Sequence, residues 1–151
     1  MKRTQPPKLG EFHRRGISTT LTVVDEALCE FEQWAKGRET RSVLHRERNT
    51  LSAAQRRALL AQIRDMRAVL RELDHELDLE GAVQDAARAI WAKASALREH
   101  VIELESRHLR RYGQPPTGLA EYLDPRVADL VKRLDRIASA VSERSEEADP
   151  S

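Results

Sequence analysis

The sequence predicts an all-α protein, an up-down four-helix bundle built on a long helical hairpin. The strongest observation is an apolar stripe whose members alternate spacings of four and three residues: Val83, Ala87, Ile90, Ala94, Leu97, Val101 and Leu104. An α-helix is the structure that places residues with this spacing on one face. Composition agrees, because 34% of the residues are charged while glycine and proline number only six each. Alternating strand-type patterns are missing apart from residues 17–24, which also fit a helix.

The first helix is expected to run from Ser18, a plausible N-cap, to Lys36, just before Gly37. Residues 1–16 before it are polar and basic and are expected to form a flexible arm. The charged connection at 37–51 can hold a short extra helix around Arg41 to Arg46.

The second helix is expected to begin at Ser52, with Gln55 three residues later. This pair predicts a capping box, in which each side chain accepts a hydrogen bond from a free backbone amide of the other residue. The helix continues through apolar positions that share one face, Ile63, Met66, Leu70, Leu73 and Leu77. The chain is expected to reverse at residues 79–81.

The third helix is expected to reach Tyr112, because Gly113 and two prolines follow. The fourth helix is predicted from Asp124, a cap residue, followed by Pro125 at the first helical position. Its apolar positions are Val127, Leu130, Val131, Leu134, Ile137, Ala138 and Val141. Residues 17–143 would then form one helical-bundle domain, followed by a frayed acidic tail at 144–151.

The four expected helices differ in length. At 1.5 Å per residue, the second and third span roughly 40 and 45 Å, and the other two span about 30 Å. The uncovered end of the longer pair needs a cover, either from residues 37–51 or from a second copy of the chain. The third helix also carries apolar residues beside its stripe: Ala86, Trp91, Ile102 and Leu109. Because so wide a stripe contacts more than one neighbouring helix, we expect coiled-coil-like packing and a homodimer.

Charge and cysteine content limit the environment of the protein. The formal net charge is +1, so net charge by itself indicates no partner. Arginine outnumbers lysine 21 to 5, which fits either a GC-rich genome or selection for bidentate contacts to phosphate or carboxylate. Cys29 is the single cysteine and cannot form an internal disulfide, which favours a reducing cytoplasm. No signal peptide or membrane span is visible, so no membrane partner is expected.

Metal binding is suggested by two Glu-x-x-His patterns, Glu72 with His75 and Glu105 with His108. Di-iron carboxylate bundles use this element twice at one height. In the expected hairpin the two patterns lie roughly 30 Å apart, so a shared dinuclear site is not expected. Glu105 and His108 stay as candidates for a single metal ion, although a histidine hydrogen-bonded at the bundle rim explains them as well.

Catalytic motifs are missing from the sequence. The glycine-rich phosphate loops and paired cysteines of common enzyme classes are absent, and acidic neighbours of Cys29 oppose formation of a thiolate. The sequence therefore predicts no catalytic centre and no cofactor.

Charge is instead arranged along the expected bundle. Up-down connectivity would place a group of arginines at one pole, opposite an acidic pole, as a partner-binding surface: Arg38, Arg41, Arg46, Arg48, Arg56, Arg57, Arg107, Arg110 and Arg111. The first functional hypothesis is a non-catalytic cytoplasmic protein that binds an unidentified protein partner as a scaffold, adaptor or regulatory subunit. The alternative is a nucleic-acid-binding accessory protein that uses the basic pole on phosphates. A metal-binding bundle is the third hypothesis.

Overall fold

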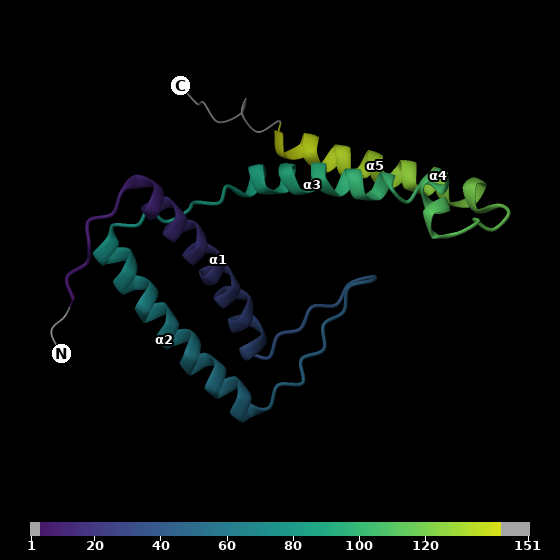
Figure 1. Cartoon of the computed structure of the whole chain (residues 1–151). Helices are drawn as coiled ribbons and strands as arrows, with labels where there is room; N and C mark the ends of the chain where they lie inside the picture. The colour runs from purple at the N-terminus through teal and green to yellow at the C-terminus, as the bar shows by residue number, and fades with distance from the viewer. Residues whose placement is uncertain (1–3, 143–151) are drawn as a thin grey trace, which may run out of the picture. The chain divides into compact units, whose positions relative to one another are not determined.

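The structure is a computed structural model that describes residues 4–142, and this part of the chain is all-α (Figure 1). The all-α prediction is therefore confirmed. The helices are α1 (Glu11–Ala35), α2 (Ala53–Leu77), α3 (Ala86–Ile102), α4 (Ser106–Leu109) and α5 (Leu119–Ser142), with a 3₁₀ turn η1 (Arg110–Tyr112) after α4. The predicted acidic tail at 144–151 lies outside the described residues.

The chain divides into two compact units, residues 1–82 and 83–151. In the first unit α1 packs against α2, and in the second α3 packs against α5 while α4 also contacts α5. The expected hairpin of the second and third helices assigns these helices to one pair, whereas the structure assigns α2 and α3 to different units. The four-helix bundle is accordingly not confirmed, and each unit is a pair of antiparallel helices.

Helix α1 begins earlier than its sequence signal suggests. It starts at Glu11, so residues 11–16 of the expected flexible arm are helical. Ser18 does not cap the helix, because its hydroxyl donates to the carbonyl oxygen of Glu80 at 2.8 Å. The C-terminal end agrees with expectation, since α1 stops at Ala35 and Gly37 follows with φ of 83°. A positive φ of this size favours glycine at that position.

The capping box that begins α2 is confirmed. The Gln55 amide donates to the Ser52 hydroxyl at 3.1 Å, and the Ser52 amide donates to the Gln55 side-chain oxygen at 2.8 Å. The helix ends at Leu77, and Asp78 adopts the left-handed conformation with φ of 50°. The reversal extends to Asp85, whose carboxylate accepts from the Arg88 amide and so caps α3.

The short helix expected in the 37–51 connection does not form. Arg41 and Arg46 instead pair as an isolated antiparallel bridge. The Glu47 amide donates to the Thr40 carbonyl at 2.9 Å, and the Ser42 amide donates to the His45 carbonyl at 2.7 Å. These bonds connect two extended strands of chain across a tight reversal, so the backbone groups that a helix would pair are used elsewhere.

The third helix is shorter than predicted. It ends at Ile102, where the amides of Leu104 and Glu105 bond three residues back and tighten the chain into a turn. Residues 106–112 then form α4 and η1 in place of continued helix. Val83, expected to open the apolar stripe, precedes the helix and is exposed.

The cap predicted at Asp124 acts on a different helix. Its two carboxylate oxygens accept from the amide and the hydroxyl of Ser106, at 2.9 and 3.0 Å, and so hold the first residue of α4. Helix α5 begins at Leu119, and Pro125 lies inside it. The half-buried side chains of Leu119 and Leu123 explain the earlier start, because helix in this region lets both pack.

Candidate interaction site

The second unit leaves one apolar face without a cover among the described residues. The α3/α5 face consists of Ile90, Leu97, Leu130 and Ile137, whose exposed fractions are 44%, 42%, 50% and 47%. Residues seven apart on a helix lie on nearly the same line along it. Ile90 and Leu97 have this spacing on α3, and Leu130 and Ile137 have it on α5. Helices α3 and α5 run antiparallel, since Arg98 bonds Asp135 while Ser106, further along the chain, bonds the earlier residue Asp124.

Rotation around each helix places these four residues together. Counting about 100° per residue, Ile90 and Leu97 are displaced from the buried Ala94 in the same rotational sense as the α5 pair is displaced from the buried Val127. Between antiparallel helices, equal displacements point to the same side. The four side chains of the α3/α5 face therefore lie on one side of the helical pair, beside the contact between the two helices.

The first unit has a comparable but smaller surface. Phe31 on α1 and Met66 and Val69 on α2 are 41%, 44% and 54% exposed. The same rotation argument places all three on one side of the α1/α2 pair. Phe31 also stacks on Trp34, with ring centroids 6.3 Å apart. Each helical pair thus buries one stripe in its own contact and leaves a second stripe exposed.

The connection between α1 and α2 is held by the Glu47 carboxylate. The Trp34 indole nitrogen donates to Glu47 Oε2 at 2.8 Å, and the Thr40 amide donates to the same oxygen at 3.1 Å. These two donors, and the nearby His45 ring, hold the pKa of the Glu47 carboxyl below its usual range. The charged carboxylate is therefore the form that supports this part of the loop.

A second carboxylate supports the base of the same loop. Glu39 accepts from the Asn49 amide at 2.9 Å and from Arg41 at 3.0 Å, and these contacts lower the pKa of its carboxyl. The Asn49 side-chain amide donates in turn to the carbonyl oxygens of Trp34 and Arg38, at 2.8 and 3.0 Å. Residues 38–49, which we call the 38–49 hairpin, are therefore fastened to the end of α1.

The tip of the 38–49 hairpin is apolar and exposed. Val43 and Leu44 occupy the reversal, and their exposed fractions are 86% and 95%. Sequence reasoning missed these two residues. The available signal is an apolar pair between arginines in a segment with few other apolar residues.

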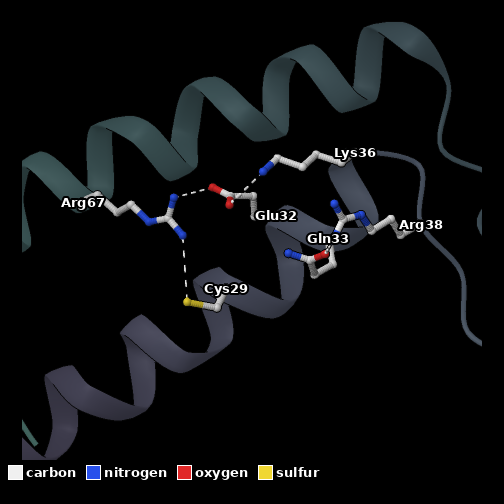
Figure 2. A network of polar contacts seen from close by, with 6 residues as sticks. All are labelled: Cys29, Glu32, Gln33, Lys36, Arg38 and Arg67. Carbon is white, nitrogen blue, oxygen red and sulfur yellow. Dashed lines mark hydrogen bonds and ion pairs between the residues drawn. The ribbon is translucent and has the colours of Figure 1, made fainter. Parts of the chain in front are cut away.

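A polar network connects the two helices of the first unit (Figure 2). Arg67 on α2 forms an ion pair with Glu32 on α1, and Lys36 pairs with the same carboxylate at 3.2 Å. The hydrogen bond from Arg67, followed by that from Lys36, lowers the pKa of Glu32, and the bond to Glu32 raises the pKa of Arg67. Arg67 also lies 3.9 Å from the Cys29 sulfur.

Beside this network lies a hollow of about 480 Å³ between α1, α2 and the segment after α2. Leu21, Leu70 and Leu79 supply apolar lining, and Asp25 and Asp74 supply carboxylates. By helical rotation the hollow is on the opposite side of the pair from Phe31 and Met66. We call it the α1/α2 hollow.

The arginines of the predicted basic pole fall into two groups in different units. The first unit brings together Arg41, Arg46 and Arg48 with Glu39 and Glu47 around one surface depression. Within the part of the chain that the structure describes, Arg46 and Arg48 form no ion pair.

The other arginines of that group lie nearby in the first unit. The Arg56 guanidinium packs against Gly37, where an added Cβ would lie 2.6 Å from its nitrogen. Arg38 bonds Gln33 at the end of α1, and Arg57 follows Arg56 on α2. The first unit therefore carries a basic end that consists of the hairpin and the start of α2.

The arginines of the second unit are mostly engaged. Arg107 pairs with Glu105 at 3.3 Å, and Arg111 pairs with Glu103 at 3.0 Å and lies over the Tyr112 ring. The nine arginines of the predicted basic pole are therefore divided between the two units.

Glu105 and His108 do not form a metal centre with further ligands in residues 4–142, where no group of three or more such side chains gathers. Glu105 precedes α4, its carboxylate pairs with Arg107, and its carbonyl oxygen accepts from the His108 amide at 2.8 Å. The proximity of these two residues is thus accounted for by the turn that begins α4.

No family model, curated protein or solved structure matches the chain. Over the described residues, no helix is both long and apolar enough to cross a membrane.

Proposed function

We propose that the protein is a non-catalytic interaction protein that forms a homodimer through the α3/α5 face. The observation that carries this proposal is the set of four half-exposed aliphatic side chains at heptad spacing on two adjacent helices. A second copy of the same face offers matching chemistry, because a twofold interface pairs identical surfaces. The dimer would present its charged ends to a further protein partner as a scaffold, adaptor or regulatory subunit.

Energetics support a cover over this face. Among the described residues only Ala94 and Val127 are fully buried in the second unit, and two helices with so small a core are marginal alone. Burying an aliphatic side chain contributes about 1.5–3 kcal/mol when it goes from full exposure to full burial. Covering four half-exposed chains from each copy would therefore stabilise folding and association together.

Sedimentation velocity of a Leu97→Gln, Leu130→Gln double variant tests the proposal. The matched control is Ala96→Gln, Ala128→Gln, which adds two glutamines at exposed positions away from the face. We expect the control to sediment as a dimer and the double variant to sediment as a monomer that keeps most of its helical circular dichroism. A double variant that stays dimeric would contradict the use of this face.

The same measurement addresses the four-helix bundle expected from the sequence. If the α3/α5 face packs on the apolar stripe of the first unit of the same chain, the wild-type protein is a monomer. The double variant would then lose stability without any change in mass. A monomeric wild-type protein would thus contradict the dimer and favour a bundle within one chain.

Nucleic-acid binding is the second candidate, and Arg46 and Arg48 are the observation that favours it. These arginines lie on an ordered loop and form no ion pair within the described residues. Binding through them would weaken steeply as salt increases. Fluorescence anisotropy with labelled single- and double-stranded DNA should then show a loss of affinity on Arg46→Glu, Arg48→Glu. Equal affinity of this variant and wild type would remove the candidate.

We also propose a cytoplasmic location. The one cysteine, Cys29, is free and exposed, which suits a reducing compartment.

A further inference from the structure

The tip of the 38–49 hairpin exposes two adjacent aliphatic side chains to water. Val43 and Leu44 are almost fully exposed, whereas a loop tip in a soluble protein usually carries polar or small residues. The Glu47 carboxylate ties the hairpin to Trp34 at the end of α1, and the Glu39 carboxylate joins the two arms of the hairpin through the Asn49 amide. The exposed pair is therefore held in place before any partner arrives, which lowers the entropic cost of binding.

The tip and the α1/α2 hollow lie at different ends of the first unit. Figure 1 shows the connection between α1 and α2 extending from the end of α1. The hollow is instead lined on α1 by residues between Ser18 and Cys29, together with α2 and the segment after it. Leu21 in the hollow is about 20 Å from Ala35 along α1, at 1.5 Å per residue. Leu44 therefore cannot enter the hollow of its own chain.

Apolar chemistry matches between the two places. The hollow has about 480 Å³ of space, and three leucines and Ala82 contribute to its lining. Val43 and Leu44 are the only adjacent pair of aliphatic residues in the 38–49 hairpin. Their insertion would cover apolar surface on both sides at once.

Charge also matches. Arg46 and Arg48 follow the tip on the second arm of the hairpin, and Asp25 and Asp74 line the hollow. None of these four residues has an ion-pair partner among residues 4–142. The hollow also contains Arg67, which pairs with Glu32, and Arg71. Two carboxylates without an ion-pair partner thus line the hollow and are available to pair with the two arginines.

We propose that the 38–49 hairpin of one copy inserts Val43 and Leu44 into the α1/α2 hollow of a second copy. The exchange is reciprocal, because a twofold dimer pairs the tip of each copy with the hollow of the other. This inference rests on the proposed homodimer and adds a second contact to the one at the α3/α5 face. Two contacts joined in one chain strengthen each other through effective concentration.

Cys29 provides a direct test, because it is the single cysteine and lines the hollow. The experiment treats the full-length Leu44→Cys variant with a short bismaleimide reagent and analyses the products by denaturing mass spectrometry. We expect a covalent dimer in which peptides containing position 44 are linked to peptides containing Cys29. The reaction should fall off in the Asp25→Arg, Asp74→Arg background.

Three controls define the result. Wild type tests linkage between two Cys29 thiols, and Leu44→Cys with Cys29→Ser tests linkage between two tips. Thr50→Cys places a thiol on the same connection away from the tip. None of these should give the covalent dimer in comparable yield. Equal yield from Thr50→Cys would show unspecific collision and would overturn the proposal.

Association strength gives a second readout that does not depend on a new thiol. We expect Val43→Ser, Leu44→Ser to raise the dimer dissociation constant about tenfold or more, while Leu97→Gln, Leu130→Gln abolishes the dimer. An unchanged dissociation constant overturns the inserted tip and leaves the proposed function standing. A wild-type monomer, by contrast, removes both. A ladder of linked trimers and tetramers would overturn the reciprocal exchange.

Discussion

The two units each connect a pair of antiparallel helices, but different side-chain contacts hold the two connections. In the first unit, carboxylates of Glu39 and Glu47 collect backbone amides and the Trp34 indole and so hold a projecting loop. In the second, the chain folds into α4 and η1, and Asp124 on α5 fastens the start of α4. In the first unit the carboxylates thus lie within the loop that they hold, whereas in the second unit a carboxylate on one helix caps another.

The two units also differ in where their exposed apolar side chains lie. The 38–49 hairpin carries its apolar tip away from the helices, whereas the second unit keeps its apolar surface on the α3/α5 face. Both units leave aliphatic groups exposed, and both have few fully buried residues among those described. The proposed homodimer would cover apolar side chains that each helical pair leaves exposed.

The largest expected effect tests whether the units fold separately. Val127→Asp places a carboxylate at a site that is 2% exposed, and we expect it to cost more than about 3 kcal/mol and to unfold the second unit. Trp34 and Trp91 report on the first and second units respectively. In a Trp91→Phe background, Val127→Asp should leave Trp34 emission unchanged, whereas Ile63→Asp should shift it to longer wavelength.

The control for this prediction is Ala128→Asp, which changes the neighbouring exposed position. This substitution should lower the free energy of unfolding only by the difference in helix propensity between alanine and aspartate, about 0.7 kcal/mol at most. A shift of Trp34 emission on Val127→Asp would show that the two units unfold as one.

A smaller effect is expected at the cap between α4 and α5. Asp124→Ala removes two acceptors from Ser106, and we expect a loss of about 1–2 kcal/mol in urea unfolding followed by Trp91 fluorescence. Asp124→Asn keeps one side-chain oxygen and should recover part of the loss. Identical stability of Ala, Asn and wild type at this position would show that the cap contributes nothing.

The smallest effect concerns pH and is expected in the first unit. The pKa of Glu47 and of Glu39 is lowered in the folded protein, so protonation favours the unfolded loop. Their contribution to stability is complete above the ordinary glutamate pKa of about 4.3 and is lost as the pH falls through the lowered values. Trp34 emission in the Trp91→Phe background should therefore change on acidification below about pH 4.

Glu47→Gln sharpens this test, because glutamine can accept from Trp34 but carries no charge to titrate in this range. The acid-induced change should shrink in this variant and persist in Glu26→Gln, which alters an exposed glutamate elsewhere on α1. The same acid transition in Glu47→Gln and wild type would mean that Glu47 does not govern the loop.

Local signals in the sequence predicted local features. The Ser52 capping box and the end of α1 before Gly37 follow from residues three apart or adjacent, and both are confirmed. Asp124 with Pro125 has the same local form as a cap, yet the carboxylate serves Ser106, eighteen residues away. Sequence spacing cannot distinguish these cases, since the deciding donor lies in another helix.

Helix pairing was harder to predict for the same reason. The apolar stripe on α3 predicts a buried face but does not identify the helix that covers it. In the structure, Ile90 and Leu97 of this stripe are 44% and 42% exposed. The 38–49 hairpin was also beyond local reasoning, because the Trp34 indole meets Glu47 across thirteen residues. Val43 and Leu44 form an exposed tip only because the 38–49 hairpin reverses at these residues, and their adjacency in the sequence does not predict this reversal.

The mass of the intact wild-type chain tests the central claim most directly. Sedimentation equilibrium over a dilution series from about 100 to 1 μM covers the dissociation constants expected for an interface of modest size. The account predicts a dimer of twice 17.2 kDa at the upper concentrations. A mass of 17.2 kDa throughout the series would contradict it.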